Sequence, residues 1–170
     1  MTQSLTDRQL ALYAALAISV HLIEAGIPSP LPGVKPGLAN VVALVVLLRH
    51  GVAAAAWVTG LRVVGGSLLL GTFLGPSFIL AAAGGVAAVA MLALLHTSTG
   101  TLLGPVGYAV PAAIAHTAAQ LAVARLLFIP DPGLWQLAPV LFAFAVAAGI
   151  TTGIIAAGII ARLPPRHDAS

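Results

Sequence analysis

Six apolar segments, separated by short stretches rich in proline, glycine or charge, make up almost the whole chain. A helix needs about 20 apolar residues to cross the hydrocarbon core of a bilayer. The second segment is too short to cross alone at ~1.5 Å per residue, so we expect it to be tilted, half-inserted or extended into its neighbours. The pattern predicts an all-α membrane protein with about six transmembrane helices, at residues 9–27, 38–48, 52–70, 77–95, 102–128 and 137–160.

The connections between these segments hold the residues that end helices. The stretch 27–37 contains too much proline to be helical, and residues 71–76 and 129–133 predict turns. Residues 96–100 predict a polar loop. Pro105 and Pro111 predict a kink or a broken start in the fifth segment.

The two ends of the chain are polar and flank a single transmembrane domain over residues 1–170. Residues 1–8 lack the basic region and the cleavage site of a signal peptide, so they indicate a retained cytoplasmic tail. Residues 162–170 predict a loose tail.

Composition supports lipid as the solvent for most of the surface. The chain is 60% hydrophobic and only 6% charged, whereas a soluble domain is about 25% charged. Its mean hydropathy is +1.10. Seven Lys or Arg and four Asp or Glu could not cover a globule facing water. We therefore expect the lipid bilayer to surround the helices.

The sequence pI near 10.2 does not indicate a nucleic-acid partner, because the basic residues are dispersed. Arg8, Arg49, Arg162 and Arg166 lie at predicted helix ends, where cytoplasmic Lys and Arg accumulate. This bias predicts a multi-pass protein of the inner, cytoplasmic membrane, with both termini in the cytoplasm.

Polar side chains at bilayer depth are the candidates for a binding site, because such groups are costly in lipid and usually face a cavity. His116 and Gln120 are four residues apart, which places them on one helix face. The cytoplasmic half of each predicted helix is almost entirely apolar. We expect a small-molecule pocket that opens outward under the proline-rich loop, lined by Glu24, Lys35, Asn40, Arg62, His116 and Gln120.

Structural alternatives exist for several of these residues. Glu24 and Arg62 could form an ion pair that locks two helices. Asn40 could cap a helix or bond between helices, and Lys35 and Arg125 could anchor the helices at the interface.

Small residues spaced four apart also occur on two predicted helices. Ala11 and Ala15 form such a face on the first, and Gly149 and Gly153 form one on the sixth. These faces allow close helix packing, which we favour as internal packing over contact with a partner subunit.

Several kinds of chemistry have no residues to support them. Without cysteine, the chain has no disulfide or thiolate chemistry, and its four acidic residues are isolated from one another. No Gly-Lys-Ser/Thr occurs, so ATP cannot energise transport through this chain itself. We expect no enzyme activity, no metal and no cofactor.

The stretch 22–40, LIEAGIPSPLPGVKPGLAN, resembles the signature of a membrane family called both the Gx transporter family and heptaprenyl diphosphate synthase component I. The resemblance continues through Arg62 with its following glycines, and through His116 and Gln120. Pro36 and Thr117 depart from the pattern, where an aliphatic residue and Asn are common.

This family is similar to the S components of energy-coupling-factor transporters, which implies six helices, a vitamin-like solute bound from outside, and docking on a transmembrane coupling subunit with two ATPases. The face at Ala11 and Ala15 would then meet that subunit. For an uptake subunit, the mixed charge of the expected pocket favours a polar or anionic ligand with some apolar body, and a vitamin-like compound, a flavin or an isoprenoid precursor would fit. The alternative is a non-catalytic accessory or anchor of prenyl diphosphate synthesis, since the chain lacks the paired aspartates of that chemistry.

Overall fold

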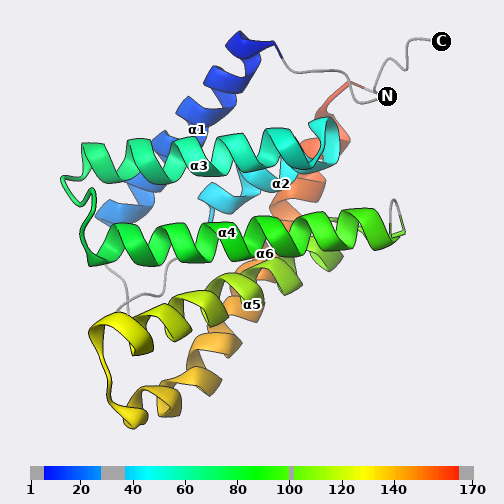
Figure 1. Ribbon diagram of the computed structural model, residues 1–170. Helices are drawn as coiled ribbons and strands as arrows, with labels where there is room; N and C mark the ends of the chain where they lie inside the picture. Colours follow the sequence, from blue (N-terminus) through cyan, green and yellow to red (C-terminus); the bar gives the residue numbers. More distant parts are fainter. Residues whose placement is uncertain (1–5, 28–36, 100–101, 165–170) are drawn as a thin grey trace.

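The computed structural model describes residues 6–27, 37–99 and 102–164, and all regular structure within them is helical (Figure 1). The predicted all-α class is therefore confirmed. The elements are α1 (Asp7–Gly26), α2 (Ala39–His50), α3 (Val52–Leu69), α4 (Pro76–Thr99), α5 (Pro105–Val123), the π-helix η1 (Ala124–Phe128), the 3-10 helix η2 (Pro132–Leu137) and α6 (Ala138–Arg162).

Five of these helical segments are long and apolar enough to cross a membrane: α1, α3, α4, α5 with η1, and η2 with α6. Large apolar side chains cover their outer surfaces; Leu12, Trp57 and Val86 are each more than half exposed. In water such a surface would be unfavourable, whereas in lipid it is solvated. The chain is a multi-pass membrane protein.

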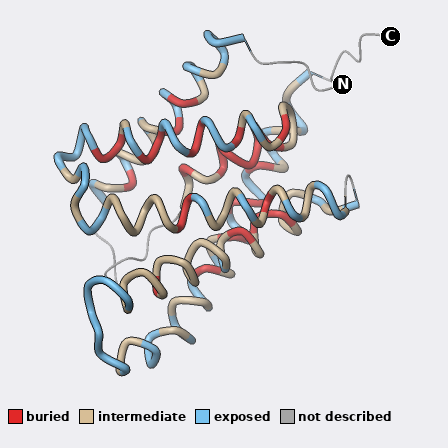
Figure 2. The backbone as a smooth tube through the Cα atoms, in the orientation of Figure 1, coloured by how far each residue is buried: buried red, intermediate tan, exposed pale blue. Residues whose placement is uncertain are grey.

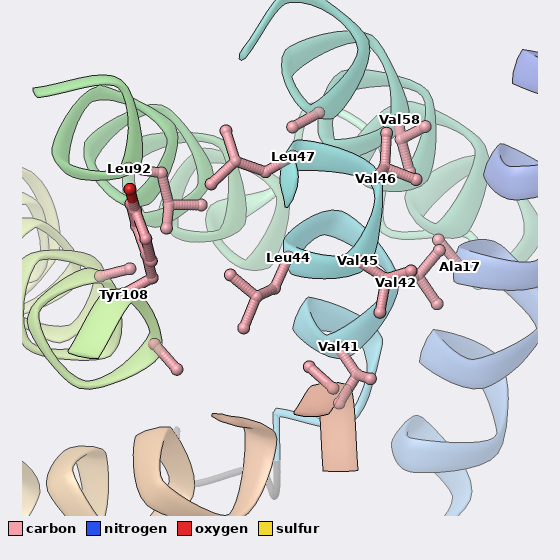
Figure 3. Close-up of a cluster of buried hydrophobic side chains, with 14 residues drawn as sticks. Ala17, Val41, Val42, Leu44, Val45, Val46, Leu47, Val58, Leu92 and Tyr108 are labelled. Carbon is pink, nitrogen blue, oxygen red and sulfur yellow. The ribbon is translucent and has the colours of Figure 1, made fainter. Parts of the chain in front are cut away.

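α2 is the central helix of the bundle. Eight of its twelve residues are buried, and it packs against α1, α3 and α6 (Figure 2). Leu44 and Leu47 point toward Tyr108 of α5, while Val46 lies beside Val58 of α3 (Figure 3). A helix that is apolar all round is normally enclosed by protein. The short second segment therefore meets other helices on most sides.

The prediction of a polar loop at residues 96–100 is wrong for residues 96–99, which the structure describes, because α4 continues to Thr99. The hydroxyl of Thr97 donates to the carbonyl of Ala93 at 3.0 Å, and that of Thr99 donates to Leu95 at 2.7 Å. Because each hydroxyl donates to a carbonyl four residues earlier in the same helix, neither needs water as a partner. The helix can therefore continue through these polar residues.

The fifth segment begins later than expected. α5 starts at Pro105, where the missing N–H of proline costs no intrahelical bond, and it continues through Pro111. Its last turn is the π-helix η1, in which the Ile129 N–H donates to the Ala124 carbonyl at 2.8 Å.

The two small-residue faces have different surroundings. A Cβ at Gly149 would lie 2.8 Å from the Val110 Cα, and one at Gly153 would lie 2.5 Å from the Val106 Cα. These glycines therefore let α6 pack directly on the backbone of α5. Ala11 and Ala15 are exposed on the outside of α1, so internal packing is the wrong interpretation for that pair.

Candidate functional site

A cavity of about 420 Å³ lies at one end of the bundle. Five of the six predicted site residues line it: Glu24, Asn40, Arg62, His116 and Gln120. Lys35 and the proline-rich loop that carries it fall within residues 28–36, which lie outside the described residues. The expected convergence of polar side chains from four helices is present.

Helix direction explains why residues so far apart in sequence share this end. The cavity wall uses the last half of α1, α3 and α5, and the first half of α2, α4 and α6. Consecutive helices run in opposite directions, so these halves lie at the same end (Figure 1). Apolar side chains from α4 and α6, including Phe78, Leu141 and Phe144, complete the wall.

Glu24 caps the start of α2. Its carboxylate accepts the backbone N–H of Leu38 at 2.5 Å and that of Ala39 at 3.2 Å. The first N–H groups of a helix lack intrahelical partners and carry partial positive charge, so a carboxylate there is stabilising. Because Glu24 is only 3% exposed, this cap joins the end of α1 to the start of α2 inside the protein.

Arg62 is held by a neutral partner. It is 7% exposed, its Nη1 donates to the Asn40 side-chain oxygen at 3.0 Å, and its Nε has no hydrogen-bond partner. Within the described ranges no carboxylate oxygen pairs with Arg62, so the Glu24–Arg62 ion pair is not formed. Asn40 lies inside the first turn of α2, and it bonds between helices instead of capping one.

His116 packs against a glycine of the neighbouring helix. A Cβ at Gly84 of α4 would lie 2.6 Å from the His116 Cε1 and 2.7 Å from each ring nitrogen. The Nδ1 atom is buried and makes no well-formed hydrogen bond. Gln120 follows one turn later and lines the same cavity, so the two residues share a face as predicted.

We expect Gly84→Ala to lower the free energy of unfolding by about 2 kcal/mol, because the new methyl group would overlap the His116 ring. Thermal unfolding in detergent measures the change. Gly60→Ala is the matched control, since nothing lies within 4 Å of a Cβ there, and it should be neutral or slightly stabilising. In the His116→Ala background the cost of Gly84→Ala should disappear; an unchanged cost would contradict this packing.

The cavity also has polar residues that the sequence did not single out: His21, Ser67, Thr72 and Ser77. His21 packs on Gly66, where a Cβ would lie 2.6 Å from its Cδ2. Its position three residues before Glu24 was the available signal, since that spacing places both on one face of α1. Arg125 lies in η1 and is not part of the cavity wall.

Fold and cavity together define a helical membrane protein with a partly open cavity, lined by several polar side chains, at one end of its bundle. Residues 13–159 match the family described as heptaprenyl diphosphate synthase component I, and the chain belongs to this family. No curated protein and no solved structure matches it. Among the residues described, no three His, Cys, Asp or Glu side chains are grouped to hold a metal ion.

Proposed function

We propose that this chain is the substrate-binding subunit of a membrane uptake system, in which a separate coupling subunit with ATPases supplies the energy. The observation that supports it most is the convergence of Glu24, Asn40, Arg62, His116 and Gln120 on one cavity. Polar groups at membrane depth are costly, and they normally mark a substrate pathway or binding site.

The cavity has the size and composition of a small-molecule site. Its volume of about 420 Å³ falls within the roughly 300–1,000 Å³ typical of ligand pockets, which are mainly apolar with a few polar groups. A vitamin-like compound, a flavin or an isoprenoid precursor has this character. Lys35 would contact such a ligand from the loop between α1 and α2.

Charge placement supports an outward-facing cavity. Arg49 and Arg162 lie at the ends of α2 and α6 away from the cavity, and Arg8 lies at the start of α1. Basic residues favour the cytoplasmic side, so both termini would be cytoplasmic in the inner membrane. The face of α1 at Ala11 and Ala15 is exposed, so it is available to a coupling subunit, as the predicted similarity to S components would require.

The family description supports a second candidate, a non-catalytic membrane subunit that partners another component of a prenyl diphosphate synthase. Such a subunit would anchor or assist a soluble enzyme in making quinone side chains. It has no need of several polar side chains around one cavity, which is why the uptake function is preferred.

Native mass spectrometry of the protein purified from its own membranes tests the proposal. We expect a retained small molecule in the wild type, and at least tenfold less in His116→Ala, because the ring forms part of the cavity wall. Ser19→Ala is the control, since Ser19 is exposed on α1 and bonds only to its own helix. Copurifying ATPase subunits would support uptake. A copurifying soluble prenyl synthase without retained ligand would establish the second candidate instead.

A further inference from the structure

We infer that the ligand carries a single carboxylate, bound by Arg62, on an otherwise apolar body. This inference rests on the proposed function and narrows its substrate class. Its basis is the charge arrangement around the cavity, where one buried cation has a neutral partner and one buried anion is already bonded to backbone.

Arg62 has unused capacity for an anion. A guanidinium has five N–H donors in a planar fork that matches a carboxylate in two-point contact. The single acceptor that the structure shows for Arg62 is the amide oxygen of Asn40, which carries no net charge. A buried cation without a directly bonded counter-ion is unfavourable, so an anionic ligand group would stabilise this arrangement.

Glu24 is not the bonded anionic partner of Arg62, although it lines the same cavity. Both of its oxygens accept backbone N–H groups at the start of α2. The partial positive charge of that helix end offsets the carboxylate charge. Both Glu24 oxygens are therefore bonded to backbone and not to Arg62, whose remaining N–H donors are available to the ligand.

The cations in the described part of the cavity wall indicate the charge of the ligand group that this wall can bind. Among the described residues that line the cavity, Arg62 is the one Lys or Arg. A diphosphate carries several negative charges, and proteins normally hold such groups with several cations or with a metal ion. Within this described wall, one guanidinium matches one negative charge, which favours a carboxylate over a diphosphate at Arg62.

The remaining wall suits an apolar body. Phe78 from α4, together with Leu141 and Phe144 from α6, contributes apolar surface to the cavity. His116 and Gln120 add hydrogen-bonding groups from α5. Asn40 acts as a positioning residue, because its bond to Nη1 fixes the direction of the guanidinium.

Matched acids and amides test this inference. Purified protein in detergent is titrated with arylalkanoic acids of increasing chain length, each compared with its primary amide, and with geranyl diphosphate. We expect the best acid to bind at least tenfold more tightly than its amide, and Arg62→Gln to abolish that preference. Ser19→Ala should retain it. If Arg62→Gln does not fold, Arg62→Lys serves instead, and the acid should still be preferred but bind about tenfold more weakly.

The outcomes separate this inference from the function on which it rests. Equal, saturable binding of acid and amide, or tighter Arg62-dependent binding of geranyl diphosphate, would overturn the carboxylate assignment and leave uptake standing. If no probe binds saturably and the purified protein retains no small molecule, both the assignment and the uptake function fail.

Discussion

Replacing Gly153 by leucine is expected to lower the free energy of unfolding by about 3 kcal/mol or more. A Cβ at this position would lie 2.5 Å from the Val106 Cα and 2.8 Å from its backbone nitrogen. Backbone cannot move aside as a flexible side chain can, so α5 and α6 would have to separate. Thermal or SDS-induced unfolding of the purified protein, followed by circular dichroism, measures the loss.

Gly158→Leu provides the matched control on the same helix. Nothing lies within 4 Å of a Cβ at Gly158, and the residue is exposed. It has the same change in size and hydrophobicity but faces outward, so its stability should stay within about 0.5 kcal/mol of the wild type. Equal losses in the two variants would show that α5 and α6 do not pack through Gly153.

Glu24→Gln is expected to destabilise the protein by about 3 kcal/mol, because it removes the anionic cap of α2. One oxygen of the carboxylate becomes an NH₂ group, which would face a backbone N–H of Leu38 or Ala39 and leave that donor without an acceptor. An unsatisfied buried polar group costs about 1–3 kcal/mol, and loss of a charge-assisted bond adds to this. Unfolding by SDS titration measures the effect.

Two comparisons identify the cause of that loss. Asp7→Asn removes an exposed carboxylate from the first turn of α1 and should cost less than about 1 kcal/mol. Glu24→Gln should cost nearly the same in the Arg62→Gln background, since Glu24 bonds to α2 and not to Arg62. Strong coupling between the two substitutions would instead mean that the residues stabilise each other directly.

The positions of the helices could be predicted from sequence because apolar length is a local property. α1, α3 and α6 agree with their predicted segments to within about two residues at each end. The central position of α2 was harder to predict, since it depends on which helices surround it. The apolar residues on every side of α2 indicate a helix surrounded by other helices. Its short length instead led to the prediction that it cannot cross the membrane alone.

The candidate site could be predicted in part, because polar residues in apolar segments stand out individually. Glu24, Arg62 and His116 were found this way. Their partners could not be found, since a cap by Glu24 on the backbone 14 residues later leaves no pattern in side-chain chemistry. The contact of His116 with Gly84 also becomes visible only when α4 and α5 are placed side by side.

The enclosed position of α2 has a consequence for how the chain enters the bilayer. At 12 residues and ~1.5 Å per residue it extends about 18 Å, against a hydrocarbon thickness of about 30 Å. Such a segment is too short to span that core as an independent unit. We therefore expect α2 to enter the bilayer together with α1 or α3, against which it packs, so that insertion and helix packing are coupled at this point of the chain.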